Sequence, residues 1–179
     1  MKPEALQKDK DIEQAIIMLV KWVNKGCSNP KPVILHSIRV AMKAQELGLS
    51  SPSILACYLH DLVEDTACSK QDIDEEFGSV VSNLVLSLTQ EHIEDYKERW
   101  SILLRKIIKA GREAMVIKLI DNNDNAEHVL PLVKDKKDRE IVIWKANFTF
   151  NSLREYIGEN PFFKECENNF KRVYANNGF

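Results

Sequence analysis

Apolar side chains recur every three to four residues along most of the chain, and this spacing places them on one face of a helix. The first such segment, residues 11–25, stops at Gly26, a residue type that often ends helices. Further segments with a helical pattern or helical end signals follow at 33–47, 51–65, 70–78, 79–88, 93–110, 113–128, 136–157 and 162–175. Residues 79–88 and 141–150 have compositions that also suit a strand, but their helical neighbours favour helix. The pattern therefore predicts an all-α fold.

Two serines mark expected helix starts. Ser51 precedes Pro52, so the serine is expected to cap a helix whose first residue is the proline. Ser69 stands three residues before Asp72, an arrangement that resembles a capping box with aspartate in place of glutamate. Both signals fall just before apolar runs, as helix starts should.

The segment at residues 54–66 combines an apolar run with an unusual polar end. His60 and Asp61 are adjacent, and Glu64 and Asp65 follow one helical turn later. His60 is therefore expected to share a helix face with Glu64, and Asp61 with Asp65. Burying an imidazole and three carboxylates costs several kcal/mol unless a counter-charge is present. A divalent metal is the simplest counter-charge. The alternative is a helix end on the surface with a solvated acidic cluster.

Two other apolar segments also carry a polar residue that needs an explanation. His36 lies inside the apolar run of residues 32–40, and Asp121 ends the apolar run of residues 116–120. Each has an ordinary explanation alone, since a buried histidine is often a hydrogen-bonded core residue and an aspartate often marks a helix end. Together with His60 and Asp61 they supply four ligands, which is within the usual range for a metal site.

The combination of these motifs resembles the HD superfamily of metal-dependent phosphohydrolases, and within it the RelA/SpoT-type alarmone hydrolase domain and its small stand-alone relatives. The matching residues are His36, His60-Asp61, Glu64-Asp65-Thr66, Asp72-Ile73, Phe77-Gly78, Lys118-Leu119-Ile120-Asp121 and Asn125. The resemblance implies an all-α HD-domain fold with the metal site in the core of the helical bundle. We expect one domain over residues 1–179, with a motif-bearing core at about 32–128 and C-terminal helices at 135–175 packing on it.

The resemblance also implies how the metal is held and used. His36, His60, Asp61 and Asp121 are expected to bind one divalent ion, with water at its open positions. Two imidazoles and two carboxylates suit manganese, iron or another borderline ion, and the resemblance implies Mn2+. Such an ion lowers the pKa of a bound water and polarises a phosphoryl oxygen.

Residues near these ligands receive roles by the same resemblance. Glu64 and Asp65 are expected to position or deprotonate the attacking water. Asn125 falls one turn after Asp121 and is expected to contact the ribose of a nucleotide, the alternative being a supporting or capping role. By their spacing, Lys118 and Arg39 fall three residues from a ligand and are expected to bind substrate, Lys118 by meeting a phosphate and Arg39 by facing the site. For Lys118 the alternative is an extension to solvent.

The chain departs from the family in the loop before His36. Relatives that cleave guanosine tetraphosphate carry an Arg-Lys pair there, whereas this chain has Asn24-Lys25 and a short segment to Pro32. A bis-diphosphate carries about four or more negative charges, and binding it normally recruits bidentate arginine. Lys25 and Lys31 are the candidates to supply part of the missing charge.

Three functions follow from these observations. The first is an enzyme that removes pyrophosphate from the 3′ position of a guanosine bis-diphosphate, without the synthetase domain of the long family members. The second is an HD phosphohydrolase for another nucleotide or phosphorylated metabolite. The third is a non-catalytic helical module that binds a nucleotide, although the retention of every metal and acidic position argues against a decayed site.

Composition narrows the partners and the location. Of 179 residues, 29% are charged and the formal net charge is −2, with no basic cluster, so no nucleic-acid partner is expected. The longest apolar run, residues 15–20, is too short for a membrane span, and we expect no membrane partner. The four cysteines show no CxxC spacing. They are typical of reduced thiols, so we expect a cytoplasmic protein.

Overall fold

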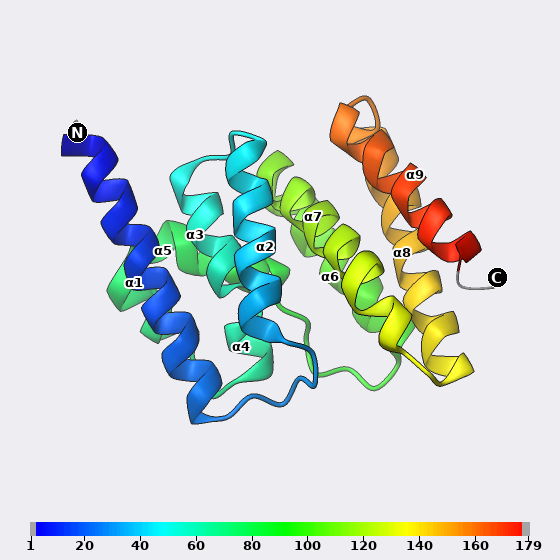
Figure 1. Cartoon of the computed structure of the whole chain (residues 1–179), viewed down its shortest axis with the longest axis horizontal. Coiled ribbons are helices and arrows are strands. Elements are labelled where there is room, and N and C mark those ends of the chain that lie inside the picture. Colours follow the sequence, from blue (N-terminus) through cyan, green and yellow to red (C-terminus); the bar gives the residue numbers. More distant parts are fainter. Residues whose placement is uncertain (1–2, 177–179) are drawn as a thin grey trace. The chain divides into compact units, whose positions relative to one another are not determined.

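The computed structural model describes residues 3–176, which are helical over most of their length and contain no strand. This result confirms the all-α prediction (Figure 1). The helices are α1 (Pro3–Lys25), α2 (Val33–Glu46), α3 (Ser51–Leu59), α4 (Leu62–Asp65), α5 (Lys70–Leu88), α6 (Tyr96–Ala110), α7 (Arg112–His128), η1 (Leu130–Leu132), α8 (Lys136–Ile157) and α9 (Pro161–Asn176). None of these described helices is long and apolar enough to cross a bilayer.

The chain divides into two compact units, residues 1–89 and residues 90–179. In the first unit α3 is the central helix, since it contacts α1, α2 and α5. Its residues 53–60 are all buried, which explains why its sequence is apolar almost without interruption. Leu19 of α1, Ala41 of α2 and Ile73 of α5 complete this core with side chains that are fully buried.

Helix starts and breaks in the first unit follow local chemistry. The Ser69 hydroxyl accepts a hydrogen bond from the Asp72 backbone N–H, and the Asp72 carboxylate accepts one from the Ser69 N–H. The predicted capping box is therefore confirmed. At Gly78 the backbone has φ of 79° and kinks α5, which separates the segments predicted at 70–78 and 79–88. Residues with a side chain rarely adopt a backbone with a positive φ of this size, whereas glycine adopts it readily.

Two expectations about α3 are wrong. The residue at its N-cap position is Ser50 rather than Ser51, and Ser50 makes no capping hydrogen bond through its side chain. The helix also ends at Leu59, and a separate single turn, α4, starts at Leu62. His60 and Asp61 thus occupy the junction of two helices, although both keep right-handed helical backbone angles. The Asp65 N–H still donates to the Asp61 carbonyl, so one helical turn is preserved across the motif.

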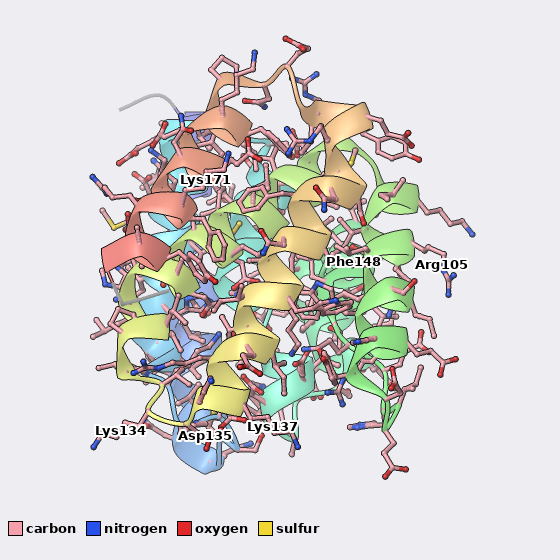
Figure 2. The ribbon with its side chains drawn as sticks, turned by 90° about the vertical axis from the view of Figure 1, so that its right-hand side faces the viewer. Arg105, Lys134, Asp135, Lys137, Phe148 and Lys171 are labelled. Atoms are coloured by element: carbon pink, nitrogen blue, oxygen red, sulfur yellow. The ribbon has the colours of Figure 1, made fainter. Side chains whose placement is uncertain are left out.

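In the second unit α7 is the central helix, with contacts to α6, α8 and α9. Its residues 114–121 are buried without a polar face, which is typical of a helix covered on all sides. The segment at 141–150, whose composition also suited a strand, lies inside α8. Figure 2 shows Phe148 on α8, Lys134, Asp135 and Lys137 near the start of that helix, and Arg105 pointing away from α6.

Aromatic residues of the second unit fall into two groups. Phe150, Phe162, Phe163 and Phe170 are buried, and the rings of Phe150 and Phe163 meet edge to face. They act as core residues. Trp144 is only partly buried and stacks on Phe148, while the Tyr96 ring meets it edge-on.

Candidate metal centre

Two imidazoles and a carboxylate meet in the first unit. His36 is buried on α2 and His60 is buried at the end of α3, and their Nε2 atoms lie 3.2 Å apart. The Asp61 Oδ1 lies 3.2 Å from the His60 Nε2, and the Asp61 Oδ2 lies 3.7 Å from the His36 Nε2. Packing of α2 on α3 therefore gathers three donor groups that are separated by up to 25 positions in the sequence.

A contact of the His60 Nδ1 atom determines which nitrogen of the ring carries the proton. Its Nδ1 lies 2.8 Å from the Cys57 carbonyl oxygen, which can only accept a hydrogen bond. The Nδ1 atom therefore carries the proton, and in the neutral ring the Nε2 atom keeps its lone pair directed at His36 and Asp61. A backbone carbonyl that orients an imidazole in this way is a common support for a metal-binding histidine.

Two of the three donor separations fit a single metal ion. Metal–nitrogen and metal–oxygen bonds of about 2.0–2.2 Å, set at angles of 90–110°, place neighbouring donors about 3.0–3.5 Å apart. The separations of 3.2 Å between the two Nε2 atoms and between the His60 Nε2 and the Asp61 Oδ1 fall in that range, whereas the 3.7 Å between the His36 Nε2 and the Asp61 Oδ2 lies outside it. Imidazole and carboxylate together suit a borderline divalent cation rather than a thiolate-binding one.

A lysine ammonium already balances the carboxylate of this group. The Lys31 Nζ lies 2.8 Å from the Asp61 Oδ2, and the two side chains are only 11% and 15% exposed. The contact shows that the Asp61 carboxylate attracts a positive charge. Lys31 belongs to the segment between α1 and α2, where the chain departs from the Arg-Lys pattern described above.

The two acidic residues of α4 have different surroundings. Glu64 is exposed, whereas Asp65 is partly buried and its Oδ2 accepts a hydrogen bond of 2.8 Å from the Asn29 amide. Burial raises the pKa of Asp65 to about 6, and the neighbouring Asp61 carboxylate adds to this effect. Asp65 is therefore a carboxylate that exchanges a proton close to neutral pH.

Asp121, the fourth expected ligand, is buried on α7 in the second unit and has its own polar partners there. Its Oδ2 lies 2.7 Å from the Lys118 Nζ, and its Oδ1 accepts a hydrogen bond of 2.6 Å from the Asn125 amide. Lys118 is only 7% exposed, so its side chain does not extend to solvent. The ammonium also lies 4.4 Å from the centre of the Trp100 ring.

Some residues of these networks escaped sequence reasoning. Asn29, the hydrogen-bond partner of Asp65, belongs to no recognised motif. Its only signal in the sequence is its position two residues before Lys31, in the segment between α1 and α2. The contacts of Trp100 could not be predicted either, because its indole N–H donates to the Thr149 hydroxyl, 49 residues away. Arg39, expected to face the site and bind substrate, lies partly buried on α2 one turn after His36.

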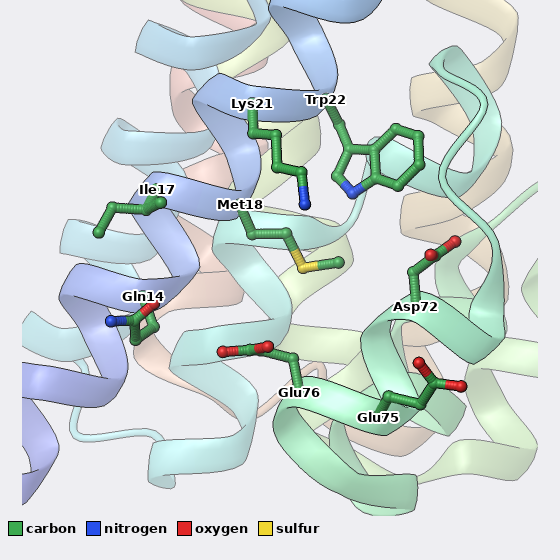
Figure 3. A pocket seen from close by; sticks show the side chains of 8 residues that line it. All are labelled: Gln14, Ile17, Met18, Lys21, Trp22, Asp72, Glu75 and Glu76. Carbon is green, nitrogen blue, oxygen red and sulfur yellow. The ribbon is translucent and has the colours of Figure 1, made fainter.

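The first unit also contains a pocket of about 230 Å³ between α1 and α5 (Figure 3). Lys21 and Trp22 of α1 face Asp72, Glu75 and Glu76 of α5 across it. No histidine lines this pocket, so it is a different place from the candidate metal centre.

Comparisons with known proteins show what the chain is similar to. Residues 18–137 match the family model of an HD domain. The chain is 34% identical over 112 residues to guanosine-3′,5′-bis(diphosphate) 3′-pyrophosphohydrolase of Aquifex aeolicus, which covers 61% of this chain and 16% of that relative. It is 33% identical over 156 residues to the bifunctional (p)ppGpp synthase/hydrolase SpoT of Escherichia coli, with 83% and 22% covered. The chain thus spans less than a quarter of the length of either curated relative.

A solved structure extends the fold comparison to nearly the whole chain. It belongs to a metazoan ortholog of SpoT that hydrolyses ppGpp, and it matches with a TM-score of 0.74 at 23% identity. The match covers 94% of this chain and 96% of that one. At this level of identity the likeness establishes the shared fold.

Proposed function

Because this chain belongs to the HD domain family, we propose that it is a metal-dependent phosphohydrolase that removes pyrophosphate from the 3′ position of guanosine 3′,5′-bis(diphosphate). The single observation that carries this proposal is the pair of buried imidazoles, His36 and His60, whose Nε2 atoms lie 3.2 Å apart with the Asp61 carboxylate beside them. The substrate class is that of the two relatives, a guanosine-3′,5′-bis(diphosphate) 3′-pyrophosphohydrolase and a (p)ppGpp synthase/hydrolase.

We propose that Asp121 supplies the fourth ligand and that residues 1–179 work as one HD domain. Support comes from the family match, which runs through both compact units and includes all four ligand positions. The proposed cation is Mn2+, in keeping with the imidazole–carboxylate donor set. When bound, such an ion polarises a phosphoryl oxygen and lowers the pKa of a coordinated water.

Glu64 and Asp65 are the proposed acid–base pair. A general base works best with a pKa near the working pH, and the raised pKa of Asp65, about 6, meets this requirement. Asn29 holds the Asp65 carboxylate in one orientation through its amide. Glu64 lies on the same turn and is exposed, so a substrate or water that enters from solvent can reach it.

The remaining polar residues are proposed to bind the nucleotide. Asn125 is assigned to the ribose, while Lys118 and Arg39 are assigned to phosphate groups. We also propose a cytoplasmic location, since a nucleotide is an intracellular substrate.

The segment between α1 and α2 favours a second candidate function, in which the same metal chemistry acts on a different nucleotide or phosphorylated metabolite. Residues 24–33 lack the Arg-Lys pair that the family resemblance led us to expect, so part of the expected phosphate-binding charge is missing. A bis-diphosphate needs more cationic partners than a monophosphate does. The two candidates share the ligands and differ only in the substrate.

The test is incubation of the purified full chain with Mn2+ and guanosine 3′,5′-bis(diphosphate), followed by anion-exchange separation of the products. The proposal expects GDP and pyrophosphate in equal amounts, and none with a chelator present. Turnover of only other phosphorylated nucleotides would favour the second candidate. Absence of all turnover, with Mn2+ still bound, would leave a nucleotide-binding module.

A further inference from the structure

The segment that connects α1 to α2 is attached to the HD motif at several points. The Lys31 ammonium contacts the Asp61 carboxylate at 2.8 Å, and the Asn29 amide donates to the Asp65 carboxylate at 2.8 Å. The Ser28 backbone N–H donates to the Asp65 carbonyl, also at 2.8 Å. This segment therefore forms one wall of the candidate metal centre within the first unit.

The structure separates the two lysines that were candidates to replace the missing basic pair. Lys25 is exposed, and its Nζ lies 4.2 Å from the centre of the Trp22 ring, so it belongs to the surface of α1. The Lys31 side chain is only 11% exposed and ends at Asp61. Of these two, only Lys31 reaches a residue of the HD motif.

Local contacts fix the backbone of Lys31. The Lys31 N–H donates to the Asn29 side-chain oxygen at 3.1 Å, and its carbonyl accepts from the Val33 N–H at 2.8 Å. Pro30 and Pro32 restrict the backbone on either side. The side chain is ordered by burial and by its contact with Asp61, and an ordered lysine loses less side-chain entropy on binding an anion than a freely moving one does.

We propose that Lys31 binds a phosphate group of the substrate and is a specificity-determining residue beside the candidate metal centre. This inference rests on the proposed function for the identity of the substrate. Its physical basis is charge balance. The Lys31 ammonium is paired with the Asp61 carboxylate, and if Asp61 held a divalent ion, the charge of that ion would balance the carboxylate instead. The mostly buried ammonium, with surplus positive charge beside it, would then favour an anion such as a diphosphate.

The test uses two binding measurements that need no turnover. Mn2+ affinity is measured by isothermal titration calorimetry, and inorganic pyrophosphate affinity is then measured on the Mn2+-loaded protein. In Lys31→Met, Mn2+ is expected to bind about threefold more tightly, because a like charge beside the ligand is gone. Pyrophosphate is expected to bind about tenfold or more weakly, the scale of one charge-assisted hydrogen bond.

Two further variants act as controls. Lys25→Met removes the same charge from the other lysine and is expected to leave both affinities within about twofold of the wild type, since Lys25 contacts Trp22. Lys31→Arg keeps the charge and is expected to keep most of the pyrophosphate affinity. Unchanged pyrophosphate affinity in Lys31→Met would overturn the proposal, and so would an equal loss in Lys31→Arg, which would indicate a distorted loop.

These readouts separate the inference from the proposed function. If guanosine 3′,5′-bis(diphosphate) is not hydrolysed but the two affinities change as expected, the role of Lys31 stands and only the substrate is different. If the nucleotide is hydrolysed and Lys31→Met binds pyrophosphate like the wild type, the function stands and the inference fails.

Discussion

The Nε2 atoms of His36 and His60 face each other at 3.2 Å, although His36 lies on α2 and His60 at the junction of α3 and α4. The His60 Nδ1 is engaged by the Cys57 carbonyl, so the ring cannot turn its Nε2 away without losing a buried hydrogen bond. The packing of α2 against α3 therefore builds the pair of imidazoles that we propose as metal ligands into the fold of the first unit. A cation that entered the site would meet donors that are already oriented.

The first prediction concerns the catalytic step. Glu64→Gln keeps the size of the side chain and removes its capacity to accept a proton, so kcat is expected to fall by about 10²-fold or more while Mn2+ affinity stays unchanged. Steady-state kinetics and a Mn2+ titration measure the two quantities. Glu76→Gln, a matched change at an exposed residue of α5, is expected to leave both as in the wild type. Loss of Mn2+ binding in Glu64→Gln would instead make Glu64 a ligand.

The second prediction follows from the raised pKa of Asp65. Burial raises this pKa from 3.8 to about 6, so the folded state holds a proton that the unfolded state has released. The contribution of Asp65 to the free energy of unfolding is therefore greatest below about pH 4 and is lost as the pH rises through about 6. Urea denaturation with a chelator present is the measurement, taken for the wild type and Asp65→Asn across this range.

The difference in the free energy of unfolding between the wild type and Asp65→Asn should fall with rising pH. Asp72→Asn provides a comparison of opposite sign, because hydrogen bonds from Ser69 lower the pKa of Asp72. Its contribution to stability should appear as the pH rises toward about 4 and remain above it. A wild-type minus Asp65→Asn difference that is constant from about pH 4 to 7 would contradict the account of Asp65.

The third prediction tests the Lys118–Asp121 pair on α7. The two side chains are 8% and 9% exposed, and Lys118→Met leaves a buried carboxylate without its ammonium. The free energy of unfolding of the metal-free protein should fall by about 3 kcal/mol. Mn2+ should stabilise this variant more than the wild type if Asp121 is a ligand, because the ion replaces the lost charge. Guanidinium denaturation with and without Mn2+ measures both effects.

An exposed lysine serves as the control for this prediction. Lys136 is 86% exposed and lies 4.0 Å from Glu140, so Lys136→Met should change the free energy of unfolding by about 0.5 kcal/mol or less. A similar small change in Lys118→Met would mean that the buried pair contributes little. Equal stabilisation of Lys118→Met and the wild type by Mn2+ would argue against Asp121 as a ligand.

Sequence periodicity predicted most helices because each buries one face or, for α3 and α7, nearly its whole surface. The helix at 136–157 was predicted with the bounds that α8 has, and Gly26, Gly78 and Gly111 marked breaks correctly. The start of α1 at Pro3 was missed, because the first turns of this helix are exposed where they are described and carry no apolar stripe. The break after Leu59 was also missed, since His60 and Asp61 keep helical backbone angles and only the hydrogen-bond ladder changes.

Motif spacing identified His36, His60 and Asp61, because a histidine or aspartate inside an apolar run is unusual enough to require a partner. The supporting contacts were not predictable in the same way. Asn29 and Lys31 reach Asp65 and Asp61 across about 30 residues, from a loop that has no periodic pattern. Contacts of this kind depend on where two helices cross, which a local pattern does not encode.

The most direct test of the central claim is a titration of the full chain with Mn2+, followed by the electron paramagnetic resonance signal of the free ion. The account predicts one tightly bound Mn2+ per chain in the wild type and in His92→Ala, which changes an exposed histidine. In His36→Ala, His60→Ala, Asp61→Ala and Asp121→Ala, affinity should fall by at least about tenfold, the smallest effect expected for a group that supports a metal site. Wild-type Mn2+ affinity in all four variants would contradict the account.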